Sequence, residues 1–592
     1  MYQITILFYL LYSVLCADPQ SRLVHLDQGP VRGYKDVNED VFVFNSIPYA
    51  TAPTGRDRFK APLLPPSWSE PFEAVEKDIK CPQANYMNIS SESFEMKEDC
   101  LIANIYVPEK IDTKLPVVVY VHGGAYVIGW GNMFRPKKLV QSNKIIAVTF
   151  NYRLGAHGFL CLGTKDVPGN AGMKDQVALL RWVNKNIAKF GGDPNEVTIA
   201  GYSAGSSSVD LLMISKMAQG LFKRVIPESG ANTAAFSIQS DPIKNAMGYA
   251  KMLNFENVED INALEDFFKT VSIEELNSPN VMDRTDSTFF MSPCVERDVG
   301  EEQFLHDNPV QILKTGNYEK LPMLYGFAEM EGLFRMPLFD IWKDRMNVKF
   351  SDFLPADLQF RDKNEKEQVA KEIKHFYFGN KMVGEETVLT YIDYFTDIIF
   401  AYPILRSVKL HVENGHDQIY LYEYSFVDND TPIIPHTNIR GANHCAQTVA
   451  VLDGFLNETI VMNENSISAD FKKMKLITRE LWLNFMTTGN PVPADSKLPA
   501  WRPVGSDWSP HMSINKTLEL RGSLLKKRMI FWEEIYDKYY RFPLKPTRPY
   551  TKKSEIEPKS QQHIFDVFDI YYFLSYFNQF PHESLRSLVK TV

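Results

Sequence analysis

A glycine-bracketed serine stands between two stretches of different character. Residues 196–200 (EVTIA) have the composition of a strand, Gly201-Tyr-Ser-Ala-Gly205 follows directly, and residues 206–215 (SSSVDLLMIS) then favour a helix. A sharp strand-to-helix turn exposes a serine hydroxyl at the edge of a sheet, and the flanking glycines tolerate the crowded backbone. The pentapeptide by itself is common by chance, but this context makes Ser203 a candidate nucleophile in an α/β protein.

The pattern around this turn predicts a parallel sheet. Residues 115–121 and 145–150 are short, continuous, β-branched runs, which are typical of strands buried on both faces. Between residues 172 and 190 apolar side chains recur at helical spacing, and Gly191-Gly192 ends that helix. A strand–helix–strand order predicts right-handed parallel crossovers. The runs 321–326 and 418–424 are expected to be later strands of the same sheet.

Two regions depart from this alternation. Residues 20–50 alternate apolar and polar side chains with turn signals, as antiparallel strands do. Residues 350–410 are charged and helical in pattern, and we expect a helical insertion there. We assign one domain to residues 18–550 and a tail to residues 551–592, which is expected to form a terminal helix.

The first seventeen residues predict a secretory signal peptide. Met1–Cys16 is an apolar run that precedes Ala17 and Asp18, so cleavage is expected near Cys16 or Ala17. The run lacks a basic start, and the alternative is a buried N-terminal strand. No later stretch has 18 uninterrupted apolar residues, so we expect no transmembrane segment.

Composition narrows the class of protein. The chain has 592 residues, 44% of them hydrophobic and 13% aromatic, which suits a large buried core. The net charge of −9 offers no basic patch, so nucleic acid is not an expected partner. Secretion would agree with four glycosylation sequons, of which the second is the poorest acceptor because Pro432 follows it. They are at Asn88, Asn429, Asn457 and Asn515.

Five cysteines remain once Cys16 leaves with the signal peptide, so at least one thiol is free or pairs between chains. Cys81 and Cys100 flank a polar segment, and we expect them to close a surface loop by a disulfide. The other cysteines lie in apolar or motif contexts and are expected to be buried thiols. They are Cys161, Cys294 and Cys445. No metal-ligand spacing such as C-x-x-C or H-E-x-x-H occurs, so no metal or cofactor is expected.

A second glycine-rich loop can complete the site of Ser203. Val121-His122-Gly123-Gly124-Ala125 follows a predicted buried strand, where such a loop turns backbone N–H groups toward a developing negative charge. The expected oxyanion-hole donors are the N–H groups of Gly124, Ala125 and Ala204.

Further motifs occur in a fixed order along the chain. They are Phe44-Asn-Ser-Ile-Pro-Tyr-Ala50, Glu98-Asp-Cys-Leu101, Asn151-Tyr-Arg-Leu-Gly155, Gly169-Asn-Ala-Gly-Met-Lys-Asp-Gln176, Phe190-Gly-Gly-Asp-Pro194 and Leu483-Asn-Phe-Met-Thr-Thr-Gly-Asn-Pro491. With these motifs the chain resembles the type-B carboxylesterase and cholinesterase family from about residue 22 to 545, and looks most like secreted or antennal insect carboxylesterases. The resemblance implies an α/β-hydrolase fold, with a large, mostly parallel sheet flanked by helices and helical insertions over an active-site gorge.

The resemblance also implies the partners of Ser203. Gly326-Phe-Ala-Glu-Met-Glu331-Gly332 matches the segment that carries the family's acid, and Gly441-Ala-Asn-His444 matches the segment of its histidine. Glu329 is the alternative acid, but it lacks the following glycine. The order Ser203, Glu331, His444 is that of this fold. His436 lies nearby in sequence and is the control for mutagenesis of His444. Ser229 matches a family serine that lies next to the triad and supports it without taking part in the reaction.

Departures from the family concern the substrate. Tyr202 stands where cholinesterases carry glutamate, and no tryptophan lies between Cys81 and Cys100 to hold choline, so choline esters are poor candidates. Phe289 and Phe290 fall near the acyl-pocket segment, although an ordinary core role is equally open.

Other departures change the loops around the site. Ala125 replaces a third glycine, and its amide donates equally well. Cys-Ala-Gln-Thr follows His444 where many relatives carry acidic residues.

The sequence therefore predicts a secreted serine carboxylesterase that acts on small, mostly apolar esters, such as odorant, pheromone, hormone or xenobiotic esters. Juvenile-hormone esterases tend to carry glutamine where this chain has Tyr202, so Tyr202 disfavours a juvenile-hormone ester as the substrate. The alternative is a catalytically silent adhesion or recognition protein of the same fold. A third hypothesis, a lipase that binds a lipid surface, is supported only by the aromatic tail. The sequence leaves the oligomeric state open.

Overall fold

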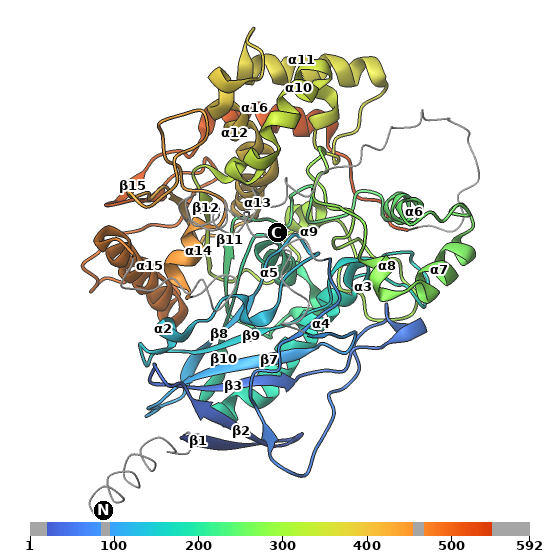
Figure 1. Cartoon of the computed structure of the whole chain (residues 1–592). Helices are drawn as coiled ribbons and strands as arrows, with labels where there is room; N and C mark the ends of the chain where they lie inside the picture. Colours follow the sequence, from blue (N-terminus) through green and yellow to red (C-terminus); the bar gives the residue numbers. More distant parts are fainter. Residues whose placement is uncertain (1–19, 85–94, 454–466, 547–592) are drawn as a thin grey trace, which may run out of the picture.

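The computed structural model describes residues 20–84, 95–453 and 467–546. The predicted signal peptide, the tail 551–592 and the sequons at Asn88 and Asn457 lie outside these residues. A thirteen-stranded sheet runs through the centre of the molecule, with helices on both faces (Figure 1).

The strands of the central sheet come from both halves of the chain. They are β1 (Ser21–Leu26), β2 (Gly29–Lys35), β3 (Val41–Pro48), β4 (Phe72–Glu73), β7 (Ile102–Pro108), β8 (Leu115–Val121), β9 (Ile146–Phe150), β10 (Gly192–Tyr202), β11 (Arg224–Glu228), β12 (Met323–Ala328), β13 (Ile419–Tyr424), β14 (His511–Ile514) and β15 (Leu518–Arg521). A separate two-stranded sheet pairs β5 (Ile79–Lys80) with β6 (Glu95–Met96).

The strand order is β1-β2-β3-β7-β9-β8-β10-β11-β12-β13-β14-β15, with β4 beside β2. Every pair from β9 to β14 is parallel, and the pairs at the two ends are antiparallel except β2 with β4. The continuous apolar runs become the parallel strands β8 and β9, and the alternating N-terminal segment becomes the antiparallel β1–β3, as predicted.

The helices follow the strands on both faces. They are α2 (Lys137–Val140), α3 (Gly155–Phe159), α4 (Ala171–Asn186), α5 (Ala204–Ile214), α6 (Pro242–Met252), α7 (Ile261–Thr270), α8 (Ile273–Leu276), α9 (Pro309–Thr315), α10 (Phe339–Val348), α11 (Lys363–Phe378), α12 (Val388–Thr396), α13 (Tyr402–Glu413), α14 (Ala446–Val451), α15 (Ala469–Thr488) and α16 (Lys526–Tyr539). Shorter 3₁₀ or π segments are η1 (Gly55–Asp57), η3 (Gly131–Met133), η4 (Ile187–Phe190), η5 (Lys216–Ala218), η6 (Glu331–Leu338), η7 (Phe350–Phe353), η8 (Glu385–Thr387) and η9 (Asp397–Ala401).

Two hydrophobic cores lie on opposite faces of the sheet. The larger contains buried side chains of α4, α5 and α13, among them Val177, Val209 and Val408. The smaller contains buried side chains of α14 and α15, among them Ala450 and Phe485. The sheet is thus covered on both sides, which is the condition for stable parallel strands.

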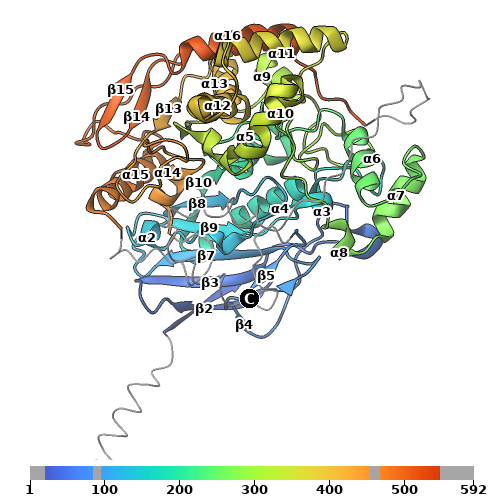
Figure 2. The same ribbon diagram turned by 45° about the horizontal axis from the view of Figure 1, so that its top comes forward.

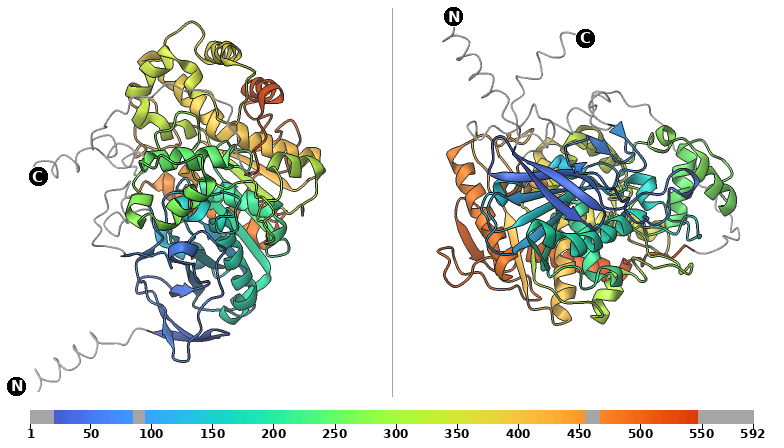
Figure 3. Two further views of the ribbon diagram at one scale, coloured as in Figure 1. Left: turned by 90° about the vertical axis from the view of Figure 1, so that its right-hand side faces the viewer. Right: turned by 90° about the horizontal axis from the view of Figure 1, so that it is seen from below.

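The predicted insertion at 350–410 is helical. Its helices α11, α12 and α13 group with α10 and α16 at the end of the molecule opposite β1 and β2 (Figures 2 and 3). The helical run Glu385–Glu413 is long and apolar enough to span a membrane, but 83% of its apolar window is buried inside the protein. That burial is typical of a core helix.

The cysteines differ in part from expectation. Cys81 and Cys100 form the predicted disulfide. Cys161 and Cys294, expected to be thiols, form a second disulfide across 133 residues of sequence, so that prediction was wrong. The Asn170 side chain donates to the Cys294 carbonyl and accepts from its N–H, both at 2.8 Å, which brings the distant segment to Cys161. Cys445 is a buried free thiol, as expected.

Candidate active site

Ser203 lies at the junction of β10 and α5 with a backbone conformation of φ +55° and ψ −123°. This region is strained for an L-residue, and such strain persists only where surrounding structure enforces it. The Ser203 N–H donates to the carbonyl of Glu228 on β11 at 2.8 Å, which fixes the turn against the sheet. A Cβ on Gly205 would stand 2.2 Å from the Val121 carbonyl oxygen, so only glycine fits there.

His444 connects Ser203 to an acid. Its Nε2 lies 2.9 Å from Ser203 Oγ, and its Nδ1 hydrogen-bonds Glu331 Oε2. His444 comes from the loop after β13, and Glu331 begins η6 after β12. The three side chains are thus joined beyond the carboxyl ends of β10, β12 and β13, where α/β sheets place their sites. This series of hydrogen bonds allows a proton to pass from the serine hydroxyl to the imidazole.

The orientation of Glu331 is fixed by the backbone. Its second carboxylate oxygen, Oε1, accepts the N–H of Ala328 at 2.8 Å, and the side chain is fully buried. Glu329, the alternative acid, pairs its own N–H with the Tyr424 carbonyl and leaves its side chain exposed. The structure therefore brings Glu331, and not Glu329, to His444.

The loop after β8 lies directly against Ser203. A Cβ on Gly123 would stand 3.0 Å from Ser203 Cβ, and a Cβ on Gly124, whose φ is +104°, would stand 2.0 Å from the Ile128 carbonyl oxygen. Among the described residues, no protein acceptor is found for the N–H groups of Gly124 and Ala125. The Ala204 N–H is at the start of α5, where amides have no partner within the helix. All three amides are thus available to an oxyanion.

His122 holds this loop. Its Nδ1 donates to the Gly123 carbonyl at 2.8 Å, and its ring stacks on Tyr152 at 4.3 Å. Because the peptide bond is planar and trans, a Gly123 carbonyl turned toward His122 points the Gly124 N–H the opposite way. Burial lowers the pKa of His122 to about 4, so the ring stays neutral.

Aromatic side chains that the sequence did not single out surround His444. Phe400 of η9 stacks on its ring with centroids 4.2 Å apart, and Phe334 of η6 contacts it edge-on at 5.3 Å. Phe236 links Phe400 to Phe289, at 5.9 and 5.8 Å. Phe334, three residues after Glu331, could have been inferred from that spacing, whereas Phe236 and Phe400 carry no local signal.

The two phenylalanines predicted near the acyl group separate. Phe289 is buried and joins the aromatic row that ends on His444. Phe290 turns toward α6, with its ring 6.1 Å from Tyr249 and the Arg284 guanidinium 4.1 Å above it. The structure therefore brings Phe289, and not Phe290, into the row of rings beside the histidine.

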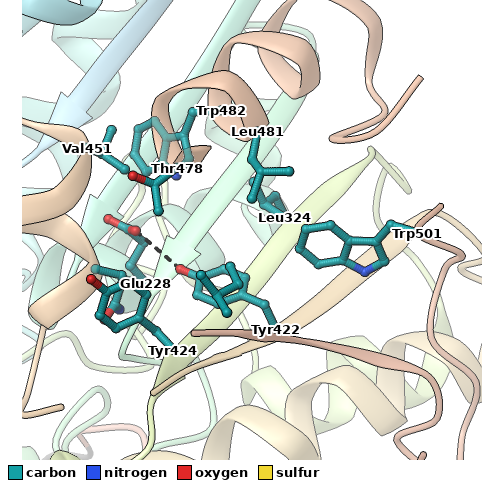
Figure 4. Close-up of a pocket in the computed structure, with 11 residues that line it drawn as sticks. Glu228, Leu324, Tyr422, Tyr424, Val451, Thr478, Leu481, Trp482 and Trp501 are labelled. Carbon is teal, nitrogen blue, oxygen red and sulfur yellow. Dashed lines mark hydrogen bonds between the residues drawn. The ribbon is translucent and has the colours of Figure 1, made fainter. Parts of the chain in front are cut away.

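A second buried carboxyl lies behind the triad. Glu228 accepts from Thr448 of α14 at 3.1 Å and from Tyr422 of β13 at 3.2 Å. Figure 4 shows this contact with Tyr422, and the small cavity beside it has a volume of about 10 Å³, room for one water. Burial, reinforced by the charge of Glu331, raises the pKa of Glu228 to about 8, so this carboxyl is mostly neutral at pH 7.

Ser229 also supports α14. Gln447 donates its amide to Ser229 Oγ at 2.6 Å, so two adjacent residues of the β11 end hold the helix that follows His444. Gln447 belongs to the Cys-Ala-Gln-Thr segment that departs from the family pattern.

The other residues named from the sequence lie away from the triad. His436 stands 3.5 Å from Glu385 and packs on Phe339. Tyr202 points to the opposite face of the sheet, where its hydroxyl contacts Met133 Sδ at 3.2 Å. The Asn429 side chain is exposed, and Asn515 donates its amide to Ser425 Oγ at 3.2 Å.

The site combines a serine on a sharp turn, a buried acid–imidazole pair and a loop with free amides, all at one edge of the sheet. This combination is that of a serine hydrolase of the α/β-hydrolase fold. The profile of the Carboxylesterase family matches residues 20–532. The chain belongs to the carboxylesterase family and is a carboxylic ester hydrolase.

Proteins similar in sequence and in structure support the assignment to this family. Juvenile hormone esterase of Heliothis virescens is 32% identical over 509 residues, covering 81% of this chain and 88% of that protein. Esterase FE4 of Myzus persicae is 30% identical, covering 83% and 88%. The crystal structure of juvenile hormone esterase from Manduca sexta, with OTFP covalently attached, superposes with a TM-score of 0.77 at 28% identity, covering 88% of this chain and all of that one.

Proposed function

We propose that this chain is a secreted serine carboxylesterase that hydrolyses small, mostly apolar esters through an acyl-enzyme. The observation that carries the proposal is the hydrogen-bonded sequence Ser203 Oγ, His444, Glu331. The apolar rings beside His444 favour an apolar substrate, which could be an odorant, pheromone, hormone or xenobiotic ester.

In the proposed mechanism His444 moves the proton in both acylation and deacylation. Ser203 Oγ attacks the ester carbonyl carbon while His444 Nε2 takes the hydroxyl proton. The N–H groups of Gly124, Ala125 and Ala204 receive the oxyanion. The intermediate then expels the alcohol, which takes a proton from His444. Water, deprotonated by the same imidazole, attacks the acyl-enzyme, and the carboxylic acid leaves as Ser203 regains its proton.

Glu331 would hold the imidazole and stabilise its cation during both steps. The backbone bond from Ala328 supports this role, because it keeps one carboxylate orientation. Phe289 is our candidate for the acyl pocket, and Ser229 for support of the helix behind His444.

Secretion is proposed on several features together. The described residues hold two disulfides, which persist in oxidising compartments. The signal-like segment 1–17 and the exposed sequon at Asn429 agree with that route. We retain the division into a signal peptide, one domain over residues 18–550 and a tail. Expression of the full chain in insect cells should release enzyme into the medium, and removal of residues 2–17 should keep it in the cells.

The direct test is hydrolysis of a p-nitrophenyl ester series from acetate to decanoate. We expect turnover by the wild type and at least a 10⁴-fold lower kcat/KM for Ser203→Ala. An organophosphate should label the wild type and not the variant. Equal rates for the two proteins would refute the esterase proposal and would favour the catalytically silent alternative, a recognition protein of the same fold.

A further inference from the structure

A buried arginine without an acidic partner lies one helical turn beyond the catalytic acid. Arg335 is on η6, four residues after Glu331, and is 1% exposed. Its Nη1 donates to the Met282 carbonyl at 2.8 Å, whereas Nε and Nη2 have no acceptor. Among the described residues no carboxylate forms an ion pair with it. Buried charges are ordinarily paired, so this one requires an explanation.

Aromatic rings surround the guanidinium. Its central carbon lies 4.9 Å from the ring centroid of Phe334, 5.2 Å from that of Trp342 and 5.6 Å from that of Phe289. Cation–π attraction replaces only part of the hydration that an arginine loses on burial. Phe334 and Phe289 are also the rings that connect to His444, directly and through Phe236 and Phe400. The charge therefore stands immediately behind the proposed acyl pocket.

Arg335 keeps its charge there. Burial lowers its pKa to about 10, which still leaves the guanidinium protonated at neutral pH. The acids whose fields reach it are Asp283 and Asp286, on the loop that carries Phe289. Asp286 is already neutralised by Arg284, and the Asp283 carboxylate is engaged by Asn280 at 2.8 Å. A positive potential thus remains on the pocket side, and a low-dielectric wall transmits it.

We propose that Arg335 is a specificity residue that sets the charge preference of the acyl pocket: among charged acyl chains it favours an anionic end, as in monoesters of dicarboxylic acids, over a cationic one. This inference rests on the proposed function, because it assumes that Phe289 borders the acyl chain. The field of an unpaired cation behind an apolar wall favours an anionic end and repels a cationic one, without direct contact. Neutral acyl chains respond only to the rings and serve as the internal reference.

Three substrates of matched length test this proposal: p-nitrophenyl hexanoate, mono-p-nitrophenyl adipate and p-nitrophenyl 6-aminohexanoate. They share the leaving group and differ in the charge at the acyl end. For the wild type we expect kcat/KM for the anionic ester to exceed that for the cationic ester at least tenfold. Arg335→Gln should reduce this ratio at least tenfold, mainly through KM, and Arg335→Lys should keep most of it.

The double variant Arg284→Gln/Asp286→Asn is the matched control, because it removes an arginine together with the carboxylate that pairs with it and so leaves the net charge of the Phe289 loop unchanged. Its ratio should change less than threefold. A wild type that hydrolyses the cationic ester as fast as the anionic one overturns the proposal, even if Arg335→Gln does not fold. An unchanged ratio in a folded Arg335→Gln also overturns it. Failure of the wild type to hydrolyse the hexanoate above Ser203→Ala refutes the proposed function instead.

Discussion

Glu331 and Glu329 stand two residues apart at the end of β12, and their side chains have different surroundings. Glu331 is buried with one oxygen on His444 and the other on the Ala328 amide, while Glu329 is exposed. The following Gly332 explains the difference, because a Cβ there would stand 2.0 Å from the Ile392 carbonyl and block the approach of η6 to α12. The glycine that identified the acid in the sequence is thus needed for its packing.

Exchange of these two acids for amides separates them. We expect Glu331→Gln to lower kcat about 10³–10⁴-fold, because an amide cannot stabilise the imidazolium and can impose the wrong tautomer. Glu329→Gln, the matched control, should stay within threefold. Steady-state kinetics on p-nitrophenyl butyrate measures both, and comparable losses in the two variants would contradict the assignment of the acid.

The neutral carboxyl of Glu228 makes stability depend on pH. Its folded pKa of about 8 lies above the unfolded value near 4.5, so the folded state holds a proton that the unfolded state releases. This contribution is complete below pH 4.5 and is lost as pH rises toward 8, by up to about 1.4 kcal/mol per pH unit. Glu228→Gln has no proton to lose.

We therefore expect the free energy of unfolding of Glu228→Gln to rise relative to wild type between pH 5 and 8. Urea unfolding at pH 5, 6.5 and 8 measures it, and parallel pH profiles of the two proteins would exclude the raised pKa. Thr448→Val is the companion variant: it removes one hydrogen bond to Glu228 and leaves the titrating group.

At the scale of elements, the strand-to-helix turn that carries Ser203 depends on how closely α5 approaches the loop after β8. Gly205 is the contact point, since a Cβ there would stand 2.2 Å from the Val121 carbonyl and 2.8 Å from that of His122. Backbone atoms on both sides cannot yield as a flexible side chain would. The strand, the turn and the helix were all predicted, because strand runs and glycine signals are local in sequence.

Gly205→Ala should therefore destabilise the protein by at least about 2 kcal/mol and lower kcat by displacing Ser203. Gly384→Ala is the control, because a Cβ there meets nothing within 4 Å, and it should stay within about 0.5 kcal/mol of wild type. Chemical unfolding and esterase kinetics report the two effects. A Gly205→Ala protein as stable and active as Gly384→Ala would show that the approach is not tight.

At the scale of the molecule, the two disulfides close loops of different length. Cys81–Cys100 spans 19 residues and Cys161–Cys294 spans 133. In the chain-entropy account the longer loop restricts the unfolded chain more. We expect Cys161→Ala/Cys294→Ala to lower the free energy of unfolding by about 3–5 kcal/mol, more than Cys81→Ala/Cys100→Ala does. Urea unfolding of both double variants decides the order, and a smaller loss for the longer loop would contradict it.

Local sequence patterns predict the main strands and helices and the candidate triad of Ser203, Glu331 and His444. Strand runs, a glycine-bracketed serine and the segments around Glu331 and His444 are set by local backbone requirements, so they can be recognised one segment at a time. The tertiary structure alone decided the Cys161–Cys294 pair, the Phe400 ring on His444 and the unpaired Arg335. These contacts join residues distant in sequence or depend on burial, and no local pattern encodes which side chains a folded chain brings together.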